Sequence, residues 1–199
     1  MRHLRLGVLV SGGGTTLQNL ADVIARGELD AELVVCIASN AHCFGIERAK
    51  RLGIPVAIVT RKEAGTLAEF SRRIAETLRE FKVDLALMAG FLSLWEIPAD
   101  FTGRVMNIHP ALLPKFGGKG MHGEHVHAAV LAAGETESGC TVHFADNAYD
   151  HGPIILQKKV PVLPGDSAET LAKRVFAAEC AAYPEAVRQY ARTDQRTGQ

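Results

Sequence analysis

Short apolar runs alternate with amphipathic segments along the first half of the chain, and this alternation restricts the possible folds more than any other feature. The runs have the length of buried strands and lie at residues 4–10, 33–38, 55–59, 85–89 and 105–108. Helices are predicted at residues 17–25, over "FGIERAKRLG" with Gly53 at its end, and at residues 66–81. Strands that alternate with helices form crossover units. We therefore expect an α/β fold with a mostly parallel, twisted sheet and helices on both faces.

The pattern changes after Pro110. "GCTVHFAD" and "PIILQKKVPV" are separated only by "NAYDHG", which predicts an antiparallel pair at the far side of the sheet. "GDSAETLAKRVFAAECAAY" predicts a long final helix, with Asp166 as its N-cap and Glu169 completing a capping box. The sequence contains no repeat, linker or low-complexity stretch, so one domain is expected.

Composition excludes several kinds of partner. Lysine and arginine together number 22, as do aspartate and glutamate, so the formal net charge is zero. This balance gives no sign of nucleic-acid or acidic-membrane binding, and any phosphate site must be local. No apolar segment approaches the roughly 20 residues of a spanning helix, and the first run is too short for a signal peptide. Four scattered cysteines fit a reducing compartment, and we expect a cytoplasmic protein. Composition is compatible with either a monomer or a homodimer.

The glycine-rich segment "SGGGTT", residues 11–16, falls between the first predicted strand and the first predicted helix. Glycines let the backbone approach a ligand, and a helix N-terminus offers unpaired N–H groups to an anion. A Walker A loop would require a lysine, which is absent. A dinucleotide fingerprint would require a glycine at Leu17 and an acidic residue at Ser39 or Asn40. A monophosphate site and a tight turn without ligand remain as alternatives.

The stretch "VMNIHPALLPKF", residues 105–116, ends a predicted strand in polar side chains. Asn107 and His109 are two residues apart and therefore point to the same side, at the sheet edge where parallel strands bind ligands. Pro110 and Pro114 stiffen the loop that follows, and Asp150 lies in the turn "YDHGP". A histidine held at a strand end only by structural hydrogen bonds is the alternative interpretation.

Such a trio suits acyl or formyl transfer to an amine. An asparagine N–H and a protonated imidazole can both stabilise the oxyanion that forms on the attacked carbon. A neighbouring carboxylate favours the imidazolium and is expected to raise the histidine pKa toward or above neutrality. A water held by the carboxylate can take the proton that the amine loses.

Six segments carry a resemblance to a known family: "SGGGTTLQ", "SNAHCFGIERAKRLGIP", "MAGFLSLW", "MNIHPALLPKF", "GCTVHFADNAYDHGPIILQKKVPV" and "GDSAETLAKRV". In that order, over residues 4–190, they resemble the phosphoribosylglycinamide formyltransferases of purine synthesis. The N-x-H-P-x-L-L-P core is shared with other formyltetrahydrofolate enzymes, whereas its combination with the opening S-G-x-G-x-x-L-Q and the final "GD" helix is specific to this family. The resemblance implies a single Rossmann-like domain, expected over residues 1–191 with a polar tail at 192–199. It also implies formyl transfer from 10-formyltetrahydrofolate, as co-substrate, to the amine of 5-phosphoribosylglycinamide.

The resemblance also implies roles for individual positions. Asn107 resembles the oxyanion-stabilising asparagine, His109 the catalytic acid, and Asp150 the aspartate that raises the histidine pKa. The positions that resemble the ribonucleotide contacts are Gly13, Gly14, Thr15, Thr16, Phe176, Ala177, Ala178 and Glu179. The positions that resemble the folate contacts are Leu92, Ser93, Leu94, Trp95, Asn107, Asp146, Asn147, Ala148, Tyr149 and Asp150.

The chain departs from the family pattern at a few positions. Thr16 stands where many relatives have asparagine, and Cys180 stands where histidine is common. Ser93 replaces a frequent arginine, and Leu67 stands where an arginine near the folate is expected. We expect Arg61 or Lys62 to supply that charge.

Three histidines, His122, His125 and His127, have H-x-x-H-x-H spacing that could hold a metal. The proposed chemistry requires no metal, and no acidic or cysteine pattern supports one, so we expect none. His127 is instead expected to be a histidine at a helix start near the active site.

Three other functions compete with this one. Formyltetrahydrofolate hydrolases share the trio but are expected to carry a regulatory domain before it, whereas the first strand here begins at Leu4. Methionyl-tRNA formyltransferase would need an RNA-binding domain after it and a basic surface. A nucleotide-binding protein without catalytic activity remains an alternative if the trio does not assemble.

Overall fold

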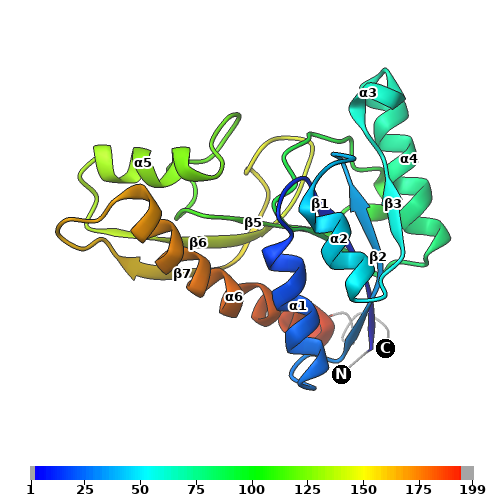
Figure 1. The fold of residues 1–199 in the computed structure, drawn as a ribbon, viewed down its shortest axis with the longest axis horizontal. Coiled ribbons are helices and arrows are strands. Elements are labelled where there is room, and N and C mark those ends of the chain that lie inside the picture. Colours follow the sequence, from blue (N-terminus) through cyan, green and yellow to red (C-terminus); the bar gives the residue numbers. More distant parts are fainter. Residues whose placement is uncertain (1–2, 194–199) are drawn as a thin grey trace.

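The computed structural model describes residues 3–193 and contains one seven-stranded sheet in the order β3-β2-β1-β4-β5-β6-β7. Five strands run parallel to one another: β1 (Leu4–Val10), β2 (Ala31–Ala38), β3 (Val56–Ile58), β4 (Leu85–Met88) and β5 (Val105–His109). Each lies within about two residues of its predicted position. Figure 1 shows this sheet at the centre of the molecule.

The last two strands, β6 (Glu137–Phe144) and β7 (Ile154–Pro161), are antiparallel to their neighbours and form one edge of the sheet. This arrangement confirms the predicted antiparallel pair. The register places His143 of β6 directly opposite Asn107 of β5. The switch to antiparallel pairing therefore brings a second histidine to the polar end of β5.

Helices cover both faces of the sheet, as predicted (Figure 1). One core lies beneath α1 (Thr15–Ala25), α2 (Phe44–Arg51), α5 (Glu124–Ala132) and α6 (Ala168–Thr193). The other lies beneath α3 (Arg61–Ala64), α4 (Leu67–Glu80) and the 3-10 helix η1 (Ala99–Phe101). The central strands divide their side chains between the two cores; in β5, Met106 and Ile108 belong to the first and Val105 to the second. Such strands read as continuous apolar runs because they are buried on both faces.

The start of α6 differs from the prediction. Ser167, not Asp166, is the cap: its hydroxyl accepts from the Thr170 N–H at 3.2 Å, and its own N–H donates to the Thr170 hydroxyl at 2.9 Å. Asp166 instead accepts the Leu163 N–H and binds Arg174 with both carboxylate oxygens. The prediction failed because two neighbouring residues, aspartate and serine, both favour the N-cap position. α3 and η1 were not predicted, since each is a single turn.

Two contacts fix α6 against the sheet and α1. Pro184 lies inside the helix, so the carbonyl of Cys180, four residues earlier, receives no helical hydrogen bond. The Asn19 side chain of α1 donates to that carbonyl at 3.0 Å. The fully buried Tyr183 hydroxyl lies 3.0 Å from each of the Met88 and Met106 carbonyls, which belong to β4 and β5. The helix is therefore anchored behind the strand ends that carry the polar residues.

The division into a domain over residues 1–191 and a tail over 192–199 stays a prediction. α6 continues to Thr193, and residues 194–199 lie outside the described part of the chain. Between residues 3 and 193, no helix is long and apolar enough to cross a membrane.

Candidate active site

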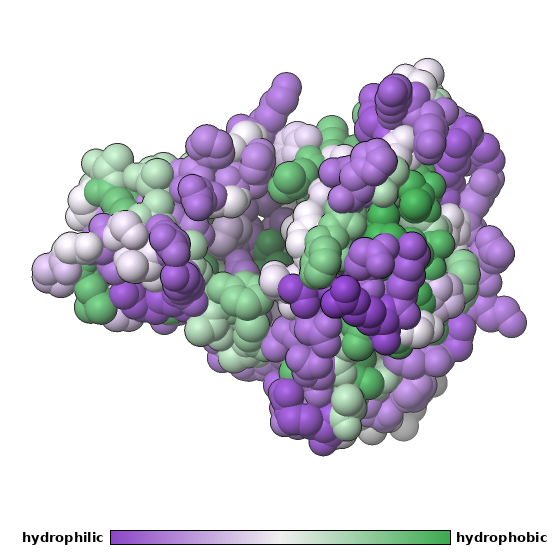
Figure 2. Space-filling model, viewed as in Figure 1, coloured by the Kyte–Doolittle hydropathy of each residue, from purple (hydrophilic) through white to green (hydrophobic). Residues whose placement is uncertain are grey.

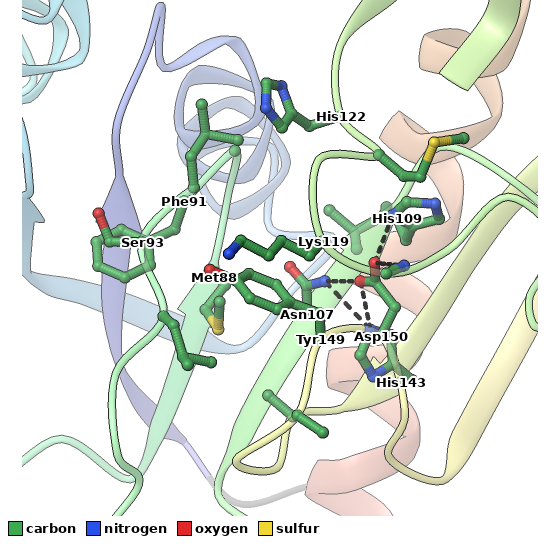
Figure 3. A pocket seen from close by; sticks show the side chains of 18 of the residues that line it. Met88, Phe91, Ser93, Asn107, His109, Lys119, His122, His143, Tyr149 and Asp150 are labelled. Carbon is green, nitrogen blue, oxygen red and sulfur yellow. Dashed lines mark hydrogen bonds and ion pairs between the residues drawn. The ribbon is translucent and has the colours of Figure 1, made fainter. Parts of the chain in front are cut away.

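Asn107, His109 and Asp150 converge at the end of β5. The His109 Nδ1 atom lies 3.4 Å from an Asp150 carboxylate oxygen, and the Asn107 Nδ2 atom donates to the other oxygen at 3.2 Å. Figure 3 shows both side chains directed at Asp150. Asp150 has a φ of 52°, a left-handed conformation that aspartate adopts more readily than most residues. The trio predicted from the sequence therefore assembles.

A fourth side chain, His143, belongs to the same cluster and was not predicted. Its Nδ1 donates to the Phe144 carbonyl at 2.9 Å, which leaves Nε2 to accept from Asn107 Nδ2 at 3.1 Å. Asn107 thus uses both hydrogens of its amide nitrogen inside the protein, one toward His143 and one toward Asp150. His143 is recognised as part of the cluster only from the register between β5 and β6, and the sequence pattern does not specify this register.

The surroundings of His109 determine its protonation. It is 3% exposed, and its Nε2 donates to the Phe116 carbonyl at 2.8 Å. Burial lowers the pKa of His109 below its usual value, and this effect exceeds the upward effects of Asp150 and of the Phe116 carbonyl. The upward effect of Asp150 has the predicted sign, but the net shift is opposite to the prediction because burial is the larger effect.

Asp150 is held as a carboxylate. Burial alone would raise its pKa, but the neighbouring His143 ring, the charge of His109 and the Gly118 N–H together lower the pKa below its usual value. The Gly118 N–H donates to the carboxylate at 2.9 Å. In this geometry an imidazolium on His109 has an acceptor at each ring nitrogen, Asp150 at Nδ1 and Phe116 at Nε2.

A cavity of about 360 Å³ opens in front of this cluster. Its lining includes Asn107, His109 and His143, with apolar side chains such as Met88 and Phe91 (Figure 3). Of the positions expected to contact the folate, those that line it are Leu92, Ser93, Leu94, Trp95, Asn107, Asp146, Ala148, Tyr149 and Asp150. Asn147 is not among the lining residues; its side-chain oxygen accepts the Ile97 N–H at 2.8 Å and so joins two walls of the cavity.

The charged groups of this cavity differ from those expected. Arg61, Lys62 and Leu67 are not among its lining residues, and the Arg61 guanidinium lies over the Phe70 ring, 5.6 Å from its centroid. Lys119, in the loop before α5, reaches into the cavity instead (Figure 3). The expectation that Arg61 or Lys62 supplies a cation here is therefore not supported by their positions.

A second cavity, of about 340 Å³, lies on the other side of β5 and shares Gly90, Ile108 and Pro110 with the first. Of the positions expected to contact the ribonucleotide, Thr15, Thr16, Phe176 and Glu179 line it, whereas Gly13, Gly14, Ala177 and Ala178 do not. In Figure 2 the surface is hollowed between the part formed by α5 and α6 and the part formed by α1 and α2. Burial raises the pKa of Glu179 to about 7.

The glycines of the loop before α1 have distinct roles. Gly14 has a φ of 72°, and a Cβ there would lie 2.7 Å from the Cα of Gly45 in α2. Gly14 is therefore required by the backbone and by helix packing, independently of any ligand. A Cβ on Gly13 would meet nothing within 4 Å. The Arg48 side chain of α2 donates to the Gly13 carbonyl at 2.8 Å, so α2 helps to fix the position of the loop.

The three histidines before and within α5 are not gathered around one point. His122 and His125 form an edge-to-face pair with ring centroids 6.0 Å apart, while His127 is buried and lines the second cavity. In the described part of the chain, no three histidine, cysteine, aspartate or glutamate side chains are placed to hold a metal ion. His127 is in the first turn of α5, where a helix-start histidine was expected.

Comparisons with known proteins agree with this architecture. The formyl transferase family model matches residues 4–187. The trifunctional purine biosynthetic protein adenosine-3 of Drosophila pseudoobscura is 42% identical over 92% of the chain, which spans 13% of that protein. The phosphoribosylglycinamide formyltransferase of Haemophilus influenzae is 36% identical over 90% of the chain and 84% of its own length.

Solved structures give the same result. The crystal structure of glycinamide ribonucleotide transformylase 1 from Symbiobacterium toebii superposes with a TM-score of 0.90 at 39% identity, covering 96% of this chain and 89% of that one. The matches span both cavities and the cluster between them. The chain therefore belongs to the formyl transferase family and, within it, to the phosphoribosylglycinamide formyltransferases.

Proposed function

We propose that the chain transfers a formyl group from 10-formyltetrahydrofolate to the amine of 5-phosphoribosylglycinamide. It acts in the cytoplasm on these small molecules, as a monomer or homodimer, without a metal. The observation that carries the proposal is the pair of adjoining cavities. They share Gly90, which follows β4, and Ile108 and Pro110, which lie at the end of β5. Two substrates bound side by side would meet beside the polar cluster, as direct transfer requires.

Each cavity suits one substrate. The first has mainly apolar walls, with polar groups gathered at Asn107, His109 and Asp150, which fits a flat heterocycle whose reactive end points at the cluster. The second has the N-terminus of α1 at Thr15 and Thr16, where backbone N–H groups suit a phosphate. Glu179 lines its opposite wall, where a carboxyl group can accept hydrogen bonds from sugar hydroxyls.

The chemistry follows from this placement. The amine nitrogen attacks the formyl carbon, a C–N bond forms, and the formyl oxygen becomes an oxyanion that accepts hydrogen bonds from His109 and Asn107. Collapse of the oxyanion breaks the bond between the formyl carbon and N10 of the folate, and His109 donates a proton to that nitrogen. The amine loses one proton through a water held by Asp150, so the net change is one proton moved from the amine to N10.

The donors of His109 and Asn107 already have acceptors within the protein. The Nε2 proton of His109 is engaged by the Phe116 carbonyl, and both Nδ2 hydrogens of Asn107 have internal acceptors. A formyl oxygen must therefore compete with these acceptors. It does so when it becomes negatively charged, because hydrogen bonds to ionised acceptors are roughly twice as strong as neutral ones. This preference applies to the transition state more than to the bound substrate, as catalysis requires.

The test is the absorbance change that accompanies conversion of 10-formyltetrahydrofolate. Turnover that requires the amine ribonucleotide supports the transferase. Turnover at the same rate without the ribonucleotide would identify a hydrolase, and binding of both ligands without turnover would identify a protein without catalytic activity. A His109→Ala variant is the control for chemistry at this cluster.

A further inference from the structure

His127 lies in the first turn of α5 and is 4% exposed. Its side chain lines the second cavity, together with Thr15, Thr16 and Glu179 from α1 and α6. The same cavity is lined by Ile108 and Pro110, which flank His109 in the sequence. The ring therefore stands in the cavity wall proposed to hold the ribonucleotide, near the reacting end of the site.

The ring is not held as a structural histidine. Buried polar side-chain atoms in folded proteins nearly always have a hydrogen-bond partner. Nδ1 of His127 is buried and finds none among residues 3–193. Two other buried side-chain atoms share this condition, Trp95 Nε1 and Ser138 Oγ, but neither residue lines this cavity. A partner for His127 is thus to be sought in what the cavity binds.

We infer that His127 hydrogen-bonds the amine ribonucleotide, through a neutral group that can both donate and accept: a ribose hydroxyl or the glycinamide amide. This inference rests on the proposed function. Burial and the charge of His109 lower the pKa of His127 and outweigh the upward effect of Glu124. The ring is therefore neutral near pH 7, with one N–H donor and one bare nitrogen. A neutral imidazole of this kind matches a hydroxyl or amide better than a phosphate.

The experiment measures binding rather than turnover. His127→Phe keeps a ring of similar shape without nitrogens, and His125→Phe is the matched control, because His125 is exposed on the same helix. Calorimetry should give a ribonucleotide Kd that is raised about tenfold in His127→Phe, as expected for one lost hydrogen bond, with the folate Kd unchanged. The control should bind both ligands like the wild type. If His127→Phe does not fold, His127→Leu, which also lacks hydrogen-bonding atoms in its side chain, serves in its place.

Ribose 5-phosphate distinguishes the two groups. If its Kd rises in the variant as well, the contact is to a hydroxyl; if only the ribonucleotide is weakened, the contact is to the amide. The ring ¹⁵N resonances of His127 in the wild type should also shift when the ribonucleotide binds, which a purely structural histidine would not show.

An unchanged ribonucleotide Kd in the folded variant, with unshifted ring resonances, would overturn the inference and leave the proposed function intact. A wild-type protein that does not bind the ribonucleotide at all would overturn both.

Discussion

Replacing Asp150 with asparagine removes the charge beside His109 while keeping the size of the side chain. At the observed 3.4 Å, two unit charges attract by about 5 kcal/mol if the effective dielectric constant is about 20. Truncating one partner of a buried charge pair typically costs about 2–5 kcal/mol. At about 1.4 kcal/mol per factor of ten, the imidazolium form of His109 becomes roughly 30-fold to 4000-fold less favoured.

The altered hydrogen bonding in Asp150→Asn also disfavours the imidazolium form of His109. Asp150 accepts from Asn107 Nδ2 with one oxygen and from the Gly118 N–H with the other. An asparagine must place its own NH₂ group at one of these positions, where it meets a donor. If the NH₂ group replaces the oxygen nearest His109, it can donate to a bare Nδ1, which again favours the neutral ring. Asp150→Asn should therefore lower the pKa of His109 further.

Activity that depends on the imidazolium is present below the His109 pKa and lost above it. The variant should be nearly inactive at neutral pH and recover part of its kcat on acidification, until protonation of the substrate amine becomes limiting. The assay is kcat from pH 5 to 8, together with an NMR titration of His109 in both proteins. An unchanged His109 titration would refute the reasoning, because it would mean that the two side chains do not interact.

Three further changes test other parts of the structure. Gly13→Val should raise the ribonucleotide KM about tenfold or more without changing the folate KM, because the valine side chain would occupy the open space beside the loop where the phosphate is proposed to bind. Gly14→Val would instead disturb the fold. Equal effects of Gly13→Val on both KM values would contradict this role. Burial raises the pKa of Glu179 to about 7, so a carboxylate there destabilises the folded state as pH rises. Glu179→Gln should thus be more stable than wild type to urea at pH 8 and nearly equal at pH 4, where the carboxyl is protonated in both states, and an equal gain at both would refute this. Tyr183→Phe should lose about 1–2 kcal/mol in urea unfolding, since the hydroxyl is fully buried between two carbonyls; an unchanged midpoint would contradict it.

The sheet could be predicted because its central strands are apolar on both faces. Runs such as Leu4–Val10 are short, continuous and separated by helical periodicity, which permits few other arrangements. The antiparallel pair was also predictable from the short connection between its strands. The pairing register was not, because it depends on contacts between segments far apart in the sequence. His143 was missed for this reason, although it lies directly opposite Asn107.

Positions at the site were more predictable than energetics. Side-chain alternation placed Asn107 and His109 together, and the structure has Asp150 beside them, as the resemblance implied. The net pKa shift of His109 depends on how deeply the ring is buried, which no local pattern reveals. The packing of Gly14 against Gly45 could not be predicted for a similar reason, since this contact joins two helices and appears only in the folded chain.

The central claim is that the formyl group passes directly from the folate to the amine. The measurement that tests it most directly uses 10-formyltetrahydrofolate labelled in the formyl carbon, with the products separated after reaction with the ribonucleotide. The proposed function predicts that the label appears in the formylated ribonucleotide, in an amount equal to the folate consumed, and that His109→Ala abolishes this transfer. Label recovered as formate, at a rate that does not depend on the ribonucleotide, would contradict it.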